Sequence, residues 1–241
     1  MSQQQGTTSF MRHIDGFFNT LDQKLEKSTK NHLKNVYSCL ALGLLAATAG
    51  AYVHVFTDLL KGNFLTALGS LGMMLLLWST PDNGSNEKLR LGYFLGFGAL
   101  TGLGTGPILD YAISVDPAII MSAFMGTCVI FGCFTLAALY APDRKFLYLG
   151  GILMSVLSTM FWMALFNIFL GSRMLFQLNL YVGLIVMCLF VLYDTQVIIE
   201  KRRMGDTDYI WHSVDLFVDF MAIFRRLLII LAQKEVSEKR R

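Results

Sequence analysis

The chain has 241 residues, of which 54% are hydrophobic and only 15% are charged, with a formal net charge of +3. Soluble globular domains carry about 25% charged residues, so this composition, with a mean hydropathy of +0.53, excludes an ordinary soluble fold. It predicts a membrane protein whose first partner is the lipid bilayer, and it gives no reason to expect a nucleic-acid partner.

The N-terminal part of the chain is polar and precedes the apolar part. It lacks the contiguous apolar stretch, roughly 7–15 residues long, of a secretory signal peptide. We therefore expect a cytoplasmic N-terminal segment over residues 1–35, followed by an apolar run from Val36 that acts as an uncleaved anchor. Residues 36–233 are predicted to form a transmembrane helical bundle, and residues 234–241 a basic C-terminal tail.

Seven apolar runs follow, each near the roughly 20 residues that cross a bilayer core about 30 Å thick as a helix. They predict an all-α polytopic membrane protein with six to seven transmembrane helices. The prolines Pro81, Pro107, Pro117 and Pro142 all lie at or near a predicted span boundary, where a missing N–H does least harm. The runs are Val36–Thr57, Phe64–Thr80, Leu91–Leu109, Ala118–Tyr140, Phe146–Leu170, Asn179–Ile199 and Ser213–Ala232.

The third run is dense in glycine. Small residues four apart allow helix backbones to approach closely in a membrane, so we expect this helix to pack tightly inside the bundle. A nucleotide-binding loop is disfavoured, because the GxGxxG spacing is absent and no strand precedes the run. The glycines are Gly92, Gly96, Gly98, Gly102, Gly104 and Gly106.

The cysteines Cys39, Cys128, Cys133 and Cys188 also lie inside apolar runs. We expect them to be small buried hydrophobic side chains, with no disulfide framework and no cysteine-based metal site.

Lysine and arginine predict the orientation in the membrane. They gather in the N-terminal segment and in the second, fourth and sixth connections, which predicts a cytoplasmic N-terminus. Seven full spans would place the C-terminus across the membrane, yet the basic tail from Lys234 to Arg241 prefers the cytoplasm. The last run therefore either crosses despite its tail or dips in and returns as a re-entrant helix.

Three aspartates lie inside the last two runs, and they are the best indication of function. Asp194 lies near the basic end of the sixth run, and Asp215 and Asp219 lie in the seventh. At about 1.5 Å per residue, Asp194 and Asp219 both lie roughly 8–11 Å below the cytoplasmic boundary. Asp215 and Asp219 are four residues apart and share a helix face. Ionisable residues at such depth face a bundle interior and mark ion or proton pathways by default.

If Asp194 and Asp219 meet, both cannot ionise at low cost, so the pair would titrate as a unit and act as a proton-sensitive latch between two helices. The alternative is a permanently protonated aspartate that only joins two helices. Arg225 and Arg226 lie deeper in the same run and can pair with acidic residues elsewhere. His54 and His212 are too isolated for a metal site or a hydrolytic triad, so we interpret them as polar boundary residues.

Three stretches carry the most specific sequence. They are Phe190-Val-Leu-Tyr-Asp-Thr-Gln-Val-Ile-Ile-Glu200 followed by Gly205-Asp206, then Ile210-Trp-His-Ser-Val-Asp-Leu-Phe-Val-Asp-Phe-Met-Ala-Ile-Phe-Arg225, and the earlier Ser122-Ala-Phe-Met-Gly-Thr127. Together they resemble the transmembrane Bax-inhibitor-motif family, and the resemblance extends over about Leu33–Glu235.

The resemblance implies two three-helix layers wrapped around a central C-terminal helix. It also implies an endoplasmic-reticulum membrane protein that suppresses cell death and provides a pH-sensitive calcium leak. The paired aspartates of the family map onto Asp194 of Tyr-Asp-Thr-Gln and Asp219 of Leu-Phe-Val-Asp-Phe. We therefore predict a pH sensor and ion pathway at Asp194, Asp219 and Asp215, with no cofactor and no tight metal site, and with transient calcium binding near Asp194 and Asp219.

Two other functions compete with a calcium and proton pathway. An intramembrane aspartyl protease is disfavoured, because Asp219 does not lie in a Gly-x-Gly-Asp context and no Pro-Ala-Leu follows; we expect no enzyme. A non-transporting membrane adaptor that binds apoptosis-regulating or stress-sensor membrane proteins stays open, because basic tails attract anionic lipid and acidic partners. A calcium pathway fits the chemistry, since Ca²⁺ takes oxygen ligands and conduction needs weak, transient binding.

Overall fold

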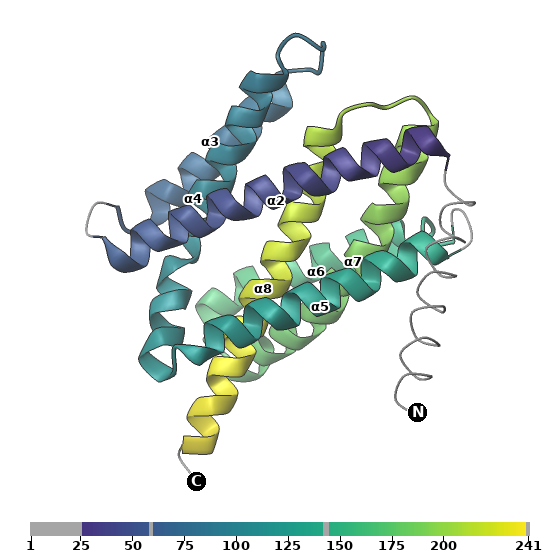
Figure 1. The fold of residues 1–241 in the computed structure, drawn as a ribbon. Coiled ribbons are helices and arrows are strands. Elements are labelled where there is room, and N and C mark those ends of the chain that lie inside the picture. Colours follow the sequence, from purple (N-terminus) through teal and green to yellow (C-terminus); the bar gives the residue numbers. More distant parts are fainter. Residues whose placement is uncertain (1–25, 58–59, 142–144, 240–241) are drawn as a thin grey trace, which may run out of the picture.

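The structure is a computed structural model that describes residues 26–57, 60–141 and 145–239 (Figure 1). Over these residues the chain forms seven α-helices and no strand, so the predicted all-α class is confirmed. The helices are α2 (Lys27–Phe56), α3 (Phe64–Ser79), α4 (Glu87–Val115), α5 (Ala118–Tyr140), α6 (Leu149–Leu170), α7 (Arg173–Arg203) and α8 (Tyr209–Lys239).

The last helix is the centre of the bundle. α8 packs against α2, α4, α5 and α7, whereas α3 packs chiefly against α4 and α6 chiefly against α7. One layer therefore consists of α2, α3 and α4, and the other of α5, α6 and α7. Figure 1 shows α8, in yellow, passing between them. This arrangement agrees with the predicted two three-helix layers around a central C-terminal helix.

The outer surface of the bundle is apolar, as a lipid environment requires. Four helices, α2, α5, α6 and α7, are long and apolar enough to cross a membrane, and α3 is a shorter apolar helix. Large side chains on α6 are freely exposed, with Ile168 at 75% and Phe169 at 84%. Soluble monomers rarely expose contiguous apolar surface on this scale. α4 and α8 are less apolar, and α8 has the interior position.

The four cysteines are all unpaired, but only two of them fit the expected burial. Cys39 and Cys188 are buried, whereas Cys128 and Cys133 are exposed. Both exposed cysteines lie on α5, on the apolar outer surface of a helix that crosses the bundle. The reason is that an apolar run in a membrane protein faces lipid as readily as it faces the core.

Two expected boundaries shift in the structure. α2 begins at Lys27, inside the segment that was assigned to the polar N-terminus, and α4 runs through Pro107 to Val115 instead of ending near that proline. Proline is tolerated within a membrane helix where neighbouring protein compensates. Here the backbone of Gly62 packs on the Leu103 carbonyl, the group whose helical hydrogen bond Pro107 removes, and a Cβ on Gly62 would lie 2.2 Å from that oxygen. Pro142 lies outside the described residues.

The glycine-dense helix packs as tightly as its sequence predicts. A Cβ on Gly102 of α4 would lie 1.8 Å from the carbonyl oxygen of Ala47 on α2, and one on Gly50 of α2 would lie 1.9 Å from the carbonyl oxygen of Ala99. Only glycine at these two positions permits the backbones of α2 and α4 to come so close. This contact fixes α2 against α4 and so shapes one wall around α8.

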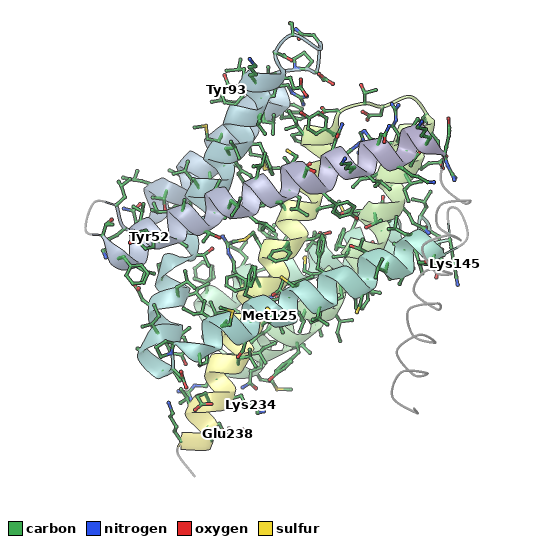
Figure 2. The ribbon with its side chains drawn as sticks, in the orientation of Figure 1. Tyr52, Tyr93, Met125, Lys145, Lys234 and Glu238 are labelled. Carbon is green, nitrogen blue, oxygen red and sulfur yellow. The ribbon has the colours of Figure 1, made fainter. Side chains whose placement is uncertain are left out.

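The bundle has two distinct ends. We call the end where α2 and α8 begin the near end, and the end where α8 finishes the far end. α8 continues without a break over 31 residues, about 46 Å of helix. At the far end the Lys239 ammonium donates a hydrogen bond to the carbonyl oxygen of Val115, the last residue of α4, at 2.7 Å. Figure 2 labels Lys234 and Glu238 at this end and Lys145 at the other. The structure thus contains a helix that passes through the bundle and does not turn back.

Candidate functional site

The structure brings the predicted aspartates together between α7 and α8. Asp194 lies nine residues before the end of α7 at Arg203, and Asp219 lies ten residues after the start of α8 at Tyr209. A short connection joins the two helices, with Gly205 at a φ of 99°, a left-handed conformation that glycine adopts without strain. Since the helices run in opposite directions from this turn, the two residues reach the same depth. The two residues thus lie at the same level of the bundle, and their distance from the cytoplasmic boundary stays a prediction.

The carboxyl groups of Asp194 and Asp219 lie close enough to interact directly with each other. Asp219 is 4% exposed, and its Oδ2 is buried and receives no hydrogen bond from any donor group among the described residues. Two ionised carboxylates offer only acceptors, so their contact is a hydrogen bond only while one of them holds a proton. A hydrogen bond between the two groups therefore requires that one of them is protonated.

Asp215 extends the site towards the near end. It lies one turn before Asp219 on the same helix, is half-buried, and interacts electrostatically with both members of the pair. The three carboxyl groups form a graded series from half-buried to buried. Across the described residues, no group of three or more histidine, cysteine, aspartate or glutamate side chains has the arrangement of a metal site. The carboxyl groups thus offer oxygen ligands without a preformed cage.

A cluster of hydroxyl groups adjoins the pair and was not identified from sequence. Thr195 follows Asp194 on α7 and is fully buried, and the Tyr37 hydroxyl interacts with both Thr195 and Thr135. The three hydroxyl groups lie in imperfect geometry, because none forms a well-directed hydrogen bond with another described residue. They come from α2, α5 and α7. The interior next to Asp194 is therefore polar over three helices.

The near end is closed by a chain of buried polar contacts. His32 Nε2 of α2 lies 2.8 Å from His212 Nδ1 of α8, and His212 Nε2 faces the Asp206 carboxylate at 3.6 Å. One of the two facing nitrogens donates to the other, and the ring tautomers determine which one is the donor. The two histidines are 6% and 1% exposed. His212 is thus a buried contact residue, which corrects its interpretation as an isolated boundary residue.

Beside this chain, Arg90 joins α4 to the start of α8. Its guanidinium donates two hydrogen bonds to the Asp208 carboxylate, and Asp208 Oδ1 also accepts from the Trp211 backbone N–H at 3.0 Å, which caps α8. Bidentate pairs of this kind are strong and directional. Sequence reasoning missed Arg90, Asp208 and His32, because each has its partner on a distant segment of the chain. In the sequence, Arg90 served only as one of the basic residues that predict orientation.

The other histidine, His54, lies at the far end where a boundary residue is expected. Its Nδ1 accepts from the Gly62 backbone N–H at 2.6 Å, and its Nε2 donates to Asp110 at 2.9 Å. These bonds hold the connection between α2 and α3 against the end of α4. This histidine has a structural partner on each ring nitrogen and takes no part in the aspartate site.

Arg225 and Arg226 do not pair with acidic side chains of the described residues, although the sequence allowed such pairing. Arg225 donates to the Thr105 hydroxyl at 2.9 Å and to the Thr101 carbonyl at 3.0 Å, and Arg226 donates to the Ala222 carbonyl at 3.2 Å. Neither forms an ion pair with any acidic residue of the described chain. Both are deeper in the bundle than Asp219, about one to two turns further along α8.

With this geometry established, comparison with known proteins places the chain. The family described as Inhibitor of apoptosis-promoting Bax1 matches residues 29–236. The chain belongs to this family. It is 55% identical over 213 residues to Bax inhibitor 1 of Homo sapiens, covering 88% of this chain and 90% of the relative. It is 55% identical over 217 residues to Probable Bax inhibitor 1 of Paralichthys olivaceus, covering 90% and 92%.

A plant relative shows how far the similarity extends. Bax inhibitor 1 of Arabidopsis thaliana is 42% identical over 218 residues, covering 90% of this chain and 87% of that protein. The match to the Bax1-inhibitor family includes the aspartate pair, the near-end histidines and both deep arginines. The chain is therefore a multi-pass membrane protein of this family, and its buried polar groups all lie within the family's common region.

Proposed function

We propose that this protein suppresses cell death in the endoplasmic-reticulum membrane as a calcium leak controlled by protons. Its relatives carry the name Bax inhibitor 1, which assigns to them an effect on cell death. The observation that carries the proposal is the direct contact of Asp194 and Asp219 inside the bundle. A membrane interior contains buried acidic pairs of this kind mainly where ions or protons pass.

The pair works as a latch between α7 and α8. While one proton is shared, the hydrogen bond ties the central helix to its neighbour. When both carboxyl groups are ionised, they repel each other in an interior of low dielectric and the helices separate. The protein's interior then offers carboxylate oxygens of Asp194, Asp219 and Asp215 to a passing Ca²⁺. Such a site binds weakly, because it has few ligands and no fixed cage, and weak binding is what conduction requires.

The test is calcium flux in liposomes that contain only the purified protein, measured over a range of pH. Asp194→Asn or Asp219→Asn keeps the shape and hydrogen bonding but removes the titration. We expect either variant to flatten the pH dependence of flux, the double variant to resemble either single one, and Asp215→Asn to have a smaller effect. Glu238→Gln removes an exposed carboxylate outside the interior and is the matched control.

A wild-type pH profile in both single variants would overturn the latch. The aspartates would then be no more than a structural contact between helices. Flux that is absent from wild-type liposomes at every pH would overturn the leak itself, since no other protein is present to supply it.

A non-transporting adaptor is the second candidate, because the relatives are named for an effect on another protein, Bax. The two functions are distinguished by the same variants in cells. If Asp219→Asn abolishes controlled flux and protection from cell death together, protection runs through the leak. If protection persists at the wild-type level without controlled flux, the protein acts through partner binding.

We also propose that the aspartate pair does no peptide hydrolysis. The support is its sequence context, Phe-Val-Asp instead of Gly-x-Gly-Asp. Cleavage of a membrane-embedded peptide by the purified protein that disappears in Asp219→Asn would contradict this proposal.

A further inference from the structure

A largely apolar cavity with a few polar groups lies towards the far end, one to two helical turns beyond Asp219. It has a volume of about 440 Å³ and is lined by Arg225, Arg226, Asn167 and Asn179 together with apolar side chains such as Ile168 and Phe176. Asn167 lies in the last turn of α6 and Asn179 in the second turn of α7, so the cavity lies within about 10 Å of the turn that joins these helices. It therefore reaches the depth at which lipid headgroups meet a membrane protein.

The cavity carries two positive charges without a compensating negative one. Arg225 is held by Thr101 and Thr105 of α4, and Arg226 bonds to a carbonyl of its own helix, but no acidic side chain of the described residues pairs with either. An unpaired guanidinium within a bilayer is energetically costly. Two adjacent ones also repel each other. The structure thus holds a charge arrangement that an anion would stabilise.

The guanidinium groups are held in place by neighbouring helices and keep unused N–H donors. Arg226 crosses α7 at Gly183, where a Cβ would lie 2.5 Å from its Nε and 3.0 Å from its Nη2. Arg225 uses Nε and Nη2 for its bonds to α4. A guanidinium has five N–H donors, so both side chains keep donors for a ligand. The Asn167 amide oxygen accepts from the Ser172 backbone N–H at 2.9 Å, which leaves the amide NH₂ as a further donor.

The cavity opens onto the lipid-facing surface. Ile168 and Phe176, in its lining, are 75% and 45% exposed. An anionic group with an attached apolar chain can therefore place its charge on the arginines and its chain along α6 and α7. Planar guanidinium groups match tetrahedral phosphate oxygens through paired hydrogen bonds.

We propose that this cavity is a binding site for a phosphate group, supplied by an anionic phospholipid or as free phosphate, with Arg225 and Arg226 as its ligands. The bound anion neutralises the two buried charges and joins α6, α7 and α8 at the far end. The proposal is independent of the calcium leak and needs neither flux nor the aspartate pair.

The experiment has a lipid arm and a phosphate arm. In the first, the protein is extracted from phosphatidylcholine membranes that contain a minor share of phosphatidic acid, and native mass spectrometry measures the retained phosphatidic acid. In the second, inorganic phosphate is titrated onto protein in phosphatidylcholine nanodiscs, and the thermal unfolding midpoint is followed. The variants are Arg225→Gln, Arg226→Gln and Ala164→Phe, which fills the cavity without touching its charges.

Lys234→Gln is the matched control, because it removes one exposed positive charge from the same helix at the same end. Loss of one charge-assisted contact weakens binding on the order of tenfold or more. The ligand is an anionic phospholipid if the wild type and the control retain phosphatidic acid and the three cavity variants retain less of it by that factor. The ligand is free phosphate if no lipid is retained and the thermal unfolding midpoint of the wild type depends on phosphate, and if this dependence is lost in the same three variants. The site is overturned if neither arm shows a response, or if the control and the cavity variants respond equally. If an arginine variant does not fold, Ala164→Phe still tests the site.

Discussion

Single residues determine how closely the helices of this bundle pack, as two glycines of α4 illustrate. Gly102 and Gly104 are two residues apart in one helix and look alike in sequence. A Cβ on Gly102 would lie 1.8 Å from a backbone oxygen of α2, whereas a Cβ on Gly104 would meet nothing within 4 Å. Backbone atoms cannot rotate out of the way as a side chain can, so Gly102 is required at this contact.

We therefore expect Gly102→Ala to lower the free energy of unfolding by about 2–3 kcal/mol, since α2 and α4 must move apart. Gly104→Ala removes the backbone freedom of a glycine in open space and should change stability by no more than about 1 kcal/mol, in the stabilising direction. Thermal unfolding of both variants in the same detergent compares them directly. Equal losses in the two variants would mean that the close contact does not limit the packing.

The same scale governs the aspartates. The protonation of a carboxyl group in a membrane interior depends on its immediate neighbours. The nearest such neighbour of Asp219 is Asp194. The predicted flattening of the pH profile by Asp→Asn therefore belongs to two side chains that act together, which is why the double variant is expected to add little.

At the near end, side-chain contacts join two helices of one layer to the central helix α8. His32 and His212 connect α2 to α8, and Arg90 and Asp208 connect α4 to the same helix start. The histidine contact needs one donor and one acceptor nitrogen, so it is lost once both facing nitrogens carry a proton. Both rings are buried, and two adjacent imidazolium ions would repel each other.

We expect acidification to well below pH 6.5 to loosen the starts of α2 and α8, because burial lowers the pKa of His32 and His212 below the ordinary imidazole value. Hydrogen exchange, corrected for its intrinsic pH dependence, should speed up at these two helix starts and stay unchanged at the turn between α4 and α5. In His32→Gln, which leaves a single histidine, the pH dependence should be weaker. Near-end exchange that responds to pH equally in wild type and variant would show that this contact is not the sensitive group.

The whole molecule is organised by α8, which begins at the near end and finishes at the far end. Its interior position explains why the last helix has carboxyl and guanidinium groups where the outer helices have apolar ones. Each helix from α3 to α8 reverses direction relative to the helix before it, so α2 and α8 begin at the same end. The C-terminal residues, fixed by the Lys239 contact to Val115, are then on the opposite side of the bundle from the start of α2.

This arrangement predicts seven crossings, with the two chain ends on opposite sides of the membrane. The natural sequon Asn83-Gly84-Ser85 lies in the connection between α3 and α4, on the near-end side, and should stay unglycosylated when that side is cytoplasmic. A sequon appended after Arg241 should be glycosylated. Sugar on Asn83 would invert the orientation, and an unmodified tail that antibody reaches without opening the reticulum membrane would instead establish a re-entrant last helix.

The sequence by itself determined the membrane class, the seven helices and the equal depth of Asp194 and Asp219. These follow from local rules, since the bilayer thickness sets the length of an apolar run and the helical rise converts residue number into depth. Only the tertiary structure decided the course of α8, the meeting of His32 with His212, and the lack of an acidic partner for Arg225 and Arg226 among the residues that it describes. The two histidines are 180 residues apart in the chain, and such a contact depends on how whole helices pack, which no local pattern of residues encodes.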